Sequence, residues 1–131
     1  MFNIVLVNPE IPPNTGNISR TCAVTGTRLH LIRPLGFEIN DKTLKRAGLD
    51  YWKDLDVSYY DSFEELEAKY SDGRFFLTST HATRSYAEVE YMDGDFLVFG
   101  RGTAGLGPEL LTRRAKDAIR IPMRHDQRSL N

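Results

Sequence analysis

The chain has 131 residues, of which 40% are hydrophobic and 27% are charged, and its formal net charge is −1. This length and composition are typical of a single globular domain with one core. No apolar run is long enough to cross a bilayer, and residues 1–10 lack the features of a signal peptide. The only cysteine, Cys22, excludes an internal disulfide and a cysteine-based metal cluster. We therefore expect a cytoplasmic protein without a membrane partner and without a metal.

Charge is distributed unevenly along the chain. Residues 1–53 contain seven Lys or Arg and four acidic residues, residues 54–95 contain three and eleven, and residues 96–131 contain seven and three. Basic segments can form an anion-binding surface on a protein whose total charge is near zero. The alternative is a scatter of solvated charges, and the charge counts alone do not decide between the two.

Short apolar runs alternate with helical patterns along the chain. Strands are expected at residues 2–7, 28–32, 57–60, 74–79, 96–99 and 118–121. Helices are expected at residues 18–25, 42–47, 63–70 and 108–115, and Ser62 with Glu65 matches a capping box at the start of the third. This alternation indicates an α/β fold in which helices flank a mainly parallel sheet.

A glycine-rich loop follows the expected strand at residues 96–99. It contains Gly100, Gly102, Gly105 and Gly107, and a helix begins directly after it. Ligands of α/β folds bind at the carboxyl edge of parallel strands, and glycine lets the backbone approach a ligand closely. We therefore interpret this loop as the floor of a cofactor site.

Residues 100–105 also fit the G-x-G-x-x-G pattern of dinucleotide-binding proteins. That pattern normally belongs to the first strand–helix–strand unit, and an acidic residue follows it about twenty residues later. Here it follows a late strand, and the strand at residues 118–121 is followed by Pro122. A dinucleotide-dependent oxidoreductase is therefore a minor alternative.

Two further segments carry polar side chains beside expected strand ends. Residues 14–20 combine Asn17 and Arg20 at a helix start, where backbone N–H groups and amides can bind an anion or a ribose. An ordinary capped helix with a surface arginine is the alternative. Residues 121–131 follow the last expected strand with arginines, a serine and an asparagine, on the same edge as the glycine loop.

The three histidines do not indicate a catalytic site. His125 precedes Asp126, but adjacent residues on a loop rarely orient each other. His30 lies in an expected strand and His81 in a loop, and we interpret both as structural. No spacing typical of a Ser–His–Asp triad or a metal site stands out.

Several motifs occur in order along the chain. They are residues 3–6, residues 9–18 with Arg20, residues 29–32, 34–37 and 45–51, Phe99 with Gly100, Thr103, Gly105 with Leu106, and residues 119–123 and 128–131. Taken together, they resemble the TrmL (YibK) group of the SPOUT superfamily, the tRNA 2'-O-methyltransferases. The resemblance extends from residue 2 to residue 131, and it is specific because separate motifs appear in the same order.

The resemblance implies an α/β knot, in which the C-terminal part threads through a loop. It also implies a homodimer that binds S-adenosylmethionine in the knot and methylates the ribose 2'-OH of the wobble nucleotide, cytidine or uridine, of leucine tRNAs. Arg20 would act at the ribose, with Asn17 beside it. By motif match, the cofactor would contact Thr78, Gly100, Ile121 and Ser129.

The high pKa of an arginine side chain limits the role that Arg20 can have at the ribose. The pKa of an arginine is above about 12, which makes it an unusual base. We therefore expect Arg20 to fix a phosphate or to lower the pKa of the 2'-OH electrostatically, while methyl transfer itself depends on in-line positioning. The basic ends of the chain would bind the RNA backbone through Lys42, Lys45, Arg46, Arg124 and Arg128.

Three features depart from the family pattern. Gly102 stands where the family usually has a glutamate, and Gly107 stands where it has a proline. The family also continues past Asn131 with a helix that completes the knot, so we expect residues 1–131 to be a single domain truncated at its C-terminus. These departures predict weak or absent cofactor binding. The alternative function is therefore a truncated, non-catalytic form of the same fold that binds RNA or dimerises.

Overall fold

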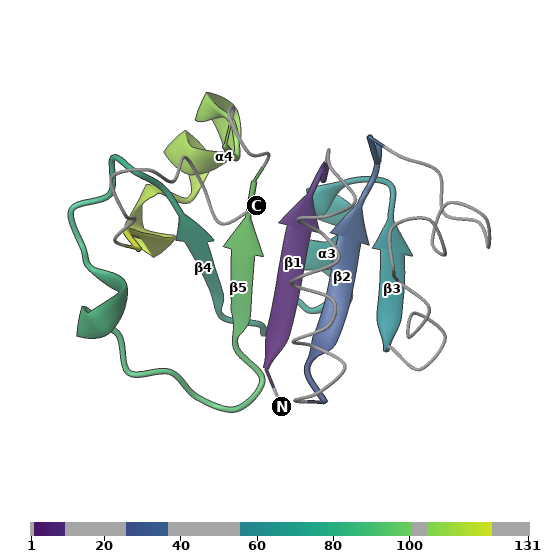
Figure 1. The fold of residues 1–131 in the computed structure, drawn as a ribbon, viewed down its shortest axis with the longest axis horizontal. Helices are drawn as coiled ribbons and strands as arrows, with labels where there is room; N and C mark the ends of the chain where they lie inside the picture. The colour runs from purple at the N-terminus through teal and green to yellow at the C-terminus, as the bar shows by residue number, and fades with distance from the viewer. Residues whose placement is uncertain (1, 10–25, 37–55, 101–104, 122–131) are drawn as a thin grey trace.

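The computed structural model of the protein describes residues 2–9, 26–36, 56–100 and 105–121. These residues form a six-stranded sheet in the order β3-β2-β1-β5-β4-β6 (Figure 1). The strands are β1 (Asn3–Val7), β2 (Arg28–Ile32), β3 (Val57–Tyr60), β4 (Phe75–Thr78), β5 (Phe96–Phe99) and β6 (Ala118–Ile119). The helices are α3 (Phe63–Lys69) and α4 (Pro108–Arg113), with 3₁₀ turns η2 (Tyr86–Glu88) and η3 (Ala115–Asp117).

All strand pairs in this sheet are parallel, which confirms the predicted α/β fold. β1 lies between β2 and β5, and Val5 is paired with His30 on one side and with Val98 on the other. The chain extends from β1 through β2 to β3 on one side of the sheet, and β4, β5 and β6 form the other side (Figure 1). The predicted knot involves residues 122–131, which lie outside the described residues, as do the predicted helices at residues 18–25 and 42–47.

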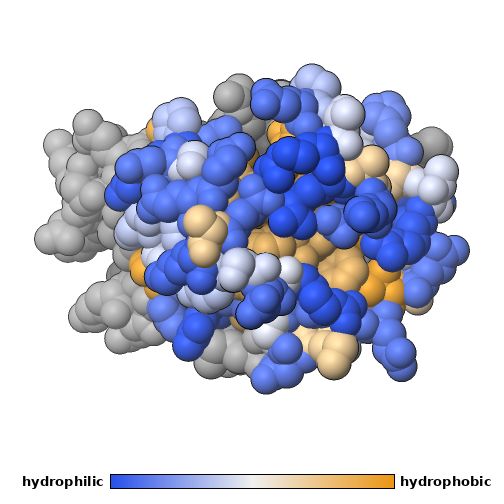
Figure 2. All heavy atoms as spheres, turned by 180° about the vertical axis from the view of Figure 1, so that it is seen from behind, coloured by the Kyte–Doolittle hydropathy of each residue, from blue (hydrophilic) through white to orange (hydrophobic). Residues whose placement is uncertain are grey.

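Helix α3 covers one face of the sheet, behind β1 and β2 in Figure 1. Its buried side chains are Phe63 and Leu66, and the Phe63 ring meets that of Phe75 edge-on at 5.7 Å between centroids. Most side chains on this side of the molecule are hydrophilic, and a hydrophobic patch lies among them (Figure 2). The buried core on this face comprises Val5, Val7, Ile32, Tyr60, Phe63, Leu66, Phe75, Leu77, Phe96, Val98 and Leu106.

The start of α3 forms only half of the predicted capping box. The Ser62 hydroxyl accepts a hydrogen bond from the Glu65 backbone N–H at 3.2 Å. The Glu65 carboxylate accepts from the N–H of Asp61, not from that of Ser62. A complete capping box instead joins Ser85 and Glu88 at the start of η2, a turn that the sequence analysis did not predict.

Three strands have the predicted bounds, and the other predicted elements that fall within the described residues are shorter than predicted. β1 begins after Phe2, β4 lacks its two predicted end residues, and α3 ends at Lys69. α4 ends at Arg113 and is followed by the turn η3. These differences are confined to element ends, where the side-chain pattern constrains the backbone least.

The last strand, β6, is shorter than predicted because the residue after it pairs with a loop and not with β4. β6 pairs with β4 only as far as Ile119, because β4 ends at Thr78. Arg120 instead forms an isolated parallel bridge with Ser85, in the loop after β4. Its backbone carbonyl accepts from the Tyr86 N–H at 2.9 Å. The loop after β4 is therefore tied to the chain that follows β6.

Candidate functional site

Three of the predicted cofactor positions lie at or just after the ends of neighbouring strands. Thr78 is the last residue of β4, Gly100 directly follows β5, and Ile121 comes two residues after β6. Because β5, β4 and β6 are adjacent and parallel, all three residues lie at the carboxyl edge of the sheet. The sheet thus brings Thr78, Gly100 and Ile121, which are far apart in the sequence, to one edge. Their contact with a cofactor stays a prediction.

The same edge contains the point at which the strand connections change direction. The chain leaves β1 toward β2 on one side and leaves β5 toward β6 on the other, while β1 and β5 are neighbours (Figure 1). In open α/β sheets, ligands bind in the crevice outside the strands at such a switch point. The segment after β1 contains Asn17 and Arg20, and the segment after β5 is the glycine loop. The topology therefore supports a site at this edge.

Gly100 cannot be replaced without a rearrangement of the glycine loop. The loop returns onto it, so that a Cβ at position 100 would lie within 3.0 Å of backbone atoms of Gly105 and Leu106. Gly100 is buried, and Leu106 is part of the hydrophobic core. The buried Leu106 side chain thus anchors the returning part of the loop beneath the edge of the sheet.

The two glycines that end the loop have backbone conformations that favour glycine. Gly105 has a φ of +65°, and Gly107 has φ +87° and ψ 151°. Among the described residues, no heavy atom lies within 4 Å of a Cβ built at either position. As far as the described residues go, the main chain at these glycines is therefore accessible to a ligand.

The backbone conformation of residue 107 accounts for one departure from the family pattern, the glycine that stands where the family has a proline. Proline fixes φ near about −65°, which is incompatible with the φ of +87° found at Gly107. Gly107 is the N-cap of α4, and Pro108 follows it at the first helical position. The second departure, Gly102, lies outside the described residues.

Thr78 is held at the end of β4 by a hydrogen bond across the sheet. Its hydroxyl donates to the backbone carbonyl of Val98 on β5 at 3.0 Å. A threonine hydroxyl has one proton and two acceptor lone pairs, so Thr78 can still accept a hydrogen bond. The side chain is half-buried and fixed in orientation, which suits a residue that meets a ligand.

Asn8 is a residue of this edge that the sequence analysis did not select. It follows β1 and has φ +52°, which is uncommon for a residue other than glycine. Its backbone N–H donates to the carbonyl of Ile32 at 3.0 Å, and its side-chain amide donates to the carbonyls of Ile32 and Pro34 at 3.4 Å. Asn8 thus ties the end of β1 to the chain after β2. An asparagine between an apolar strand and a proline was the available sequence signal.

None of the predicted RNA-contacting residues lies in the part of the chain that the structure describes. The catalytic candidate and the other predicted contacts lie outside the described residues, and their roles stay predictions. These residues are Arg20, Asn17, Lys42, Lys45, Arg46, Arg124, Arg128 and Ser129.

His30 belongs to a buried hydrogen-bond network, which agrees with its interpretation as structural. It is 1% exposed, its Nδ1 lies 2.9 Å from the Tyr60 hydroxyl, and its Nε2 lies 2.9 Å from Asn3 Oδ1. Burial, with a smaller effect from the positive charges of Lys69 and Arg28, lowers the pKa of His30 to about 4. The imidazole is therefore neutral at neutral pH and engaged at both nitrogens.

Within the described ranges, no group of three or more His, Cys, Asp or Glu side chains is arranged to hold a metal ion. No helix in this part of the chain is long and apolar enough to span a membrane.

Comparison with known proteins confirms the resemblance read from the motifs. Residues 1–131 match the SpoU rRNA Methylase family. The tRNA (cytidine(34)-2'-O)-methyltransferase of Saccharophagus degradans is 50% identical over 132 residues, which cover 100% of this chain and 86% of that protein. A solved structure from work on the 2-OH methylation of C/U34 on tRNA is 46% identical, with a TM-score of 0.87, over 100% of this chain and 86% of that chain.

A more distant structure shares the fold. The SpoU methyltransferase AviRb from Streptomyces viridochromogenes, solved in complex with the cofactor AdoMet, is 22% identical with a TM-score of 0.77. The match covers 98% of this chain and 51% of that chain. At this identity the likeness establishes the fold.

Proposed function

The chain belongs to the SpoU rRNA methylase family, and we propose that it is an S-adenosylmethionine-dependent tRNA methyltransferase. Its substrate is the ribose 2'-OH of cytidine or uridine at wobble position 34, and leucine tRNAs are its substrate class. The relatives named for methylation at position 34 support this proposal. The observation that carries it is that Thr78, Gly100 and Ile121 lie at one edge of three adjacent strands, beside the glycine loop.

The described part of this edge fits a cofactor that is held mainly by backbone. Within the described ranges, no atom lies close to the Cβ positions of Gly105 and Gly107, and Thr78 keeps acceptor capacity on its hydroxyl. Thr78, Gly100, Ile121 and Ser129 would hold S-adenosylmethionine. When bound, the cofactor supplies a methyl group on a sulfonium centre. The protein must then hold the 2'-OH in line with that group and exclude water.

Arg20 and Asn17 are the residues that we assign to the ribose. A 2'-OH is a poor nucleophile, and a nearby guanidinium lowers its pKa or fixes the adjacent phosphate. The basic residues Lys42, Lys45, Arg46, Arg124 and Arg128 would bind the RNA backbone. Such contacts make tRNA affinity fall with rising salt. We also propose that the protein works as a homodimer in the cytoplasm, where its tRNA substrate is found.

Calorimetric titration of the chain with S-adenosylmethionine tests the proposed cofactor. S-adenosylhomocysteine and NAD serve as comparisons. Binding of the first two ligands without binding of NAD is the expected result. Binding of NAD alone would instead support the dinucleotide-dependent alternative. A labelled-methyl assay on leucine tRNAs, with tRNAs of other specificities as controls, then tests the substrate.

The departures at Gly102 and Gly107 predict weaker cofactor binding than in a relative. The methyltransferase of Saccharophagus degradans, titrated under the same conditions, is the reference. Equal dissociation constants for the two proteins would contradict this prediction. A folded chain that binds tRNA but neither S-adenosylmethionine nor S-adenosylhomocysteine would support the non-catalytic alternative.

A further inference from the structure

We propose that Glu67 is a positioning residue for the glycine loop, acting through Arg113 and Arg114 at the far end of α4. This inference rests on the proposed function of the loop as a cofactor site. Glu67 lies on α3, and neither the motif analysis nor the cofactor positions include it.

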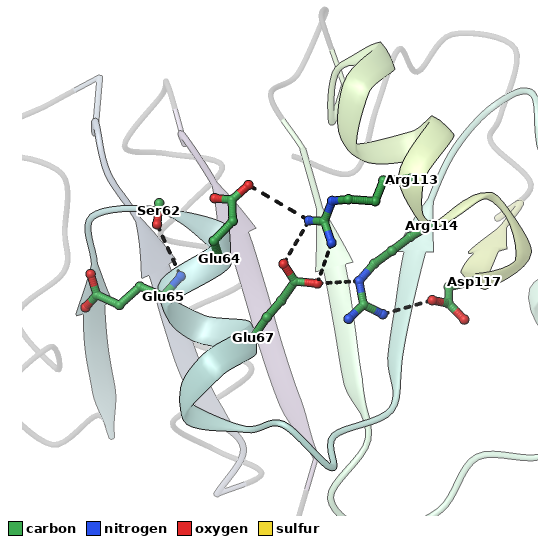
Figure 3. Close-up of polar contacts among 7 residues, drawn as sticks. All are labelled: Ser62, Glu64, Glu65, Glu67, Arg113, Arg114 and Asp117. Atoms are coloured by element: carbon green, nitrogen blue, oxygen red, sulfur yellow. Dashed lines mark hydrogen bonds and ion pairs between the residues drawn. The ribbon is translucent and has the colours of Figure 1, made fainter.

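Glu67 joins two helices that are far apart in the sequence (Figure 3). Its carboxylate accepts two hydrogen bonds from the Arg113 guanidinium, at 2.8 and 3.0 Å, and a third from Arg114 Nε at 2.6 Å. The Glu67 side chain is 15% exposed, so these bonds are partly shielded from water. Paired hydrogen bonds from arginine to carboxylate fix geometry as well as charge.

Arg114 is itself held on two further sides. Its Nη1 donates to Asp117 Oδ2 at 2.9 Å, and its guanidinium lies over the Phe75 ring at 4.9 Å from the centroid. Phe75 is a core residue of β4. The cluster of Glu67, Arg113, Arg114 and Asp117 therefore connects α3, the end of α4, η3 and the sheet.

The charge state of Glu67 suits this role. Burial acts to raise the pKa of the Glu67 carboxyl, but hydrogen bonds from Arg113 and Arg114 outweigh it, so that the pKa lies below its usual value. The carboxylate is therefore ionised at neutral pH. The same hydrogen bonds raise the pKa of Arg113.

Helix α4 connects this cluster directly to the glycine loop. The helix begins at Pro108, immediately after Gly107, and the Leu111 N–H donates to the Gly107 carbonyl at 3.3 Å. It has 6 residues and no side-chain cap at its start. A helix this short is not stable by itself, so its position depends on tertiary contacts. Within the described part of the chain, these contacts include apolar packing of Leu110 and Leu111 on the core and the bonds to Glu67.

A neighbouring acid on α3 provides a matched comparison. The Glu64 side chain is 72% exposed, and its Oε1 lies 3.9 Å from Arg113 Nη2. An exposed pair of this kind contributes little to stability, because water screens it. Replacement of Glu64 changes the net charge of α3 as replacement of Glu67 does, but it leaves the bidentate pair in place.

The test compares Glu67→Ala with Glu64→Ala in the full chain. S-adenosylmethionine affinity is measured by calorimetry well below the unfolding temperature of each variant, and amide hydrogen exchange is followed without ligand. Glu67→Ala is expected to weaken affinity by about fivefold or more, equivalent to about 1 kcal/mol, with Glu64→Ala close to wild type. Exchange at Leu111 and Arg114 should accelerate in Glu67→Ala, while Leu29 at the start of β2 should be unaffected.

A merely structural role would give a different result. Glu67→Ala would then lower the unfolding temperature but leave both the affinity and the relative exchange at Leu111 unchanged, which would overturn the proposal. Glu67→Gln retains the size and an acceptor oxygen, so it should restore part of the affinity, and it replaces the alanine variant if that one does not fold. If wild-type protein binds no S-adenosylmethionine, the proposed function fails. The exchange data then decide by themselves whether Glu67 positions the loop.

Discussion

The backbone of Gly105 lies directly against Gly100, and the space between them is too small for a side chain at position 100. This contact folds the glycine loop back beneath the end of β5, with Leu106 buried in the core. Gly105 therefore presents its main chain near the carboxyl end of β5. Because of this contact, even one added methyl group at position 100 is expected to lower the stability of the protein.

Gly100→Ala is expected to destabilise the protein by about 2–3 kcal/mol, because the new methyl group overlaps backbone that cannot move as a side chain would. Chemical denaturation measures the effect. Gly105→Ala is the matched control, since its Cβ meets open space among the described residues and adds only the conformational cost of a positive φ. Equal losses in the two variants would show that the contact at Gly100 is not tight.

Gly107→Pro should destabilise the chain, although the resemblance implies proline at this position in the family. The φ of +87° and ψ of 151° are accessible essentially to glycine alone, so any other residue forces the start of α4 to rearrange. A loss of about 1–3 kcal/mol is expected. Gly107→Ala, measured by the same denaturation experiment, should also be destabilised. An increase in stability for the proline variant would contradict the conformation described for Gly107.

Loss of His30 should flatten the dependence of stability on pH. The pKa of the buried imidazole is about 4 in the folded protein and about 6.5 when unfolded, so the unfolded state binds an additional proton as pH falls below 6.5. Folding stability is therefore full above this range and falls as the pH drops. Between pH 7.5 and pH 5.0, His30 should account for about 2 kcal/mol of that loss.

The measurement for His30 is urea unfolding of wild type and His30→Gln at both pH values. The variant loses buried hydrogen bonds, so it should be less stable at pH 7.5, and its deficit should shrink at pH 5.0. His81→Gln, on an exposed loop residue, is the control. A deficit that stays constant between the two pH values would contradict a depressed pKa for His30.

Arg20→Lys should lower the rate of methyl transfer by about 100-fold or more while leaving S-adenosylmethionine affinity within about twofold of wild type. Lysine keeps the charge but cannot reproduce the planar arrangement of donors that arginine offers a phosphate or a ribose. A single-turnover assay with tRNA, combined with calorimetry, separates the two effects. Arg28→Lys, in an exposed ion pair with Asp56, serves as a control for the charged surface. Equal activity of Arg20→Lys and wild type would show that the planar guanidinium of Arg20 is not required for the reaction.

Local patterns in the sequence were sufficient for the fold class and for several elements. The strands Arg28–Ile32, Val57–Tyr60 and Phe96–Phe99 have the predicted bounds, because each is a compact run of strand-forming residues between turn residues. The glycine pattern correctly indicated a loop at the carboxyl edge. Element ends and the turn η2 were predicted less well, because short-range hydrogen bonds such as that of Ser85 decide them.

The sequence by itself determined that strands alternate with helices and that a glycine loop follows a buried strand, since these features depend on residues close together in the chain. Only the tertiary structure decided that β4 lies between β5 and β6, which brings Thr78, Gly100 and Ile121 to one edge. It also decided that Glu67 meets Arg113, 46 residues away, and that His30 is enclosed by Asn3 and Tyr60. Contacts between distant residues depend on how the whole core packs, and no local pattern contains that information.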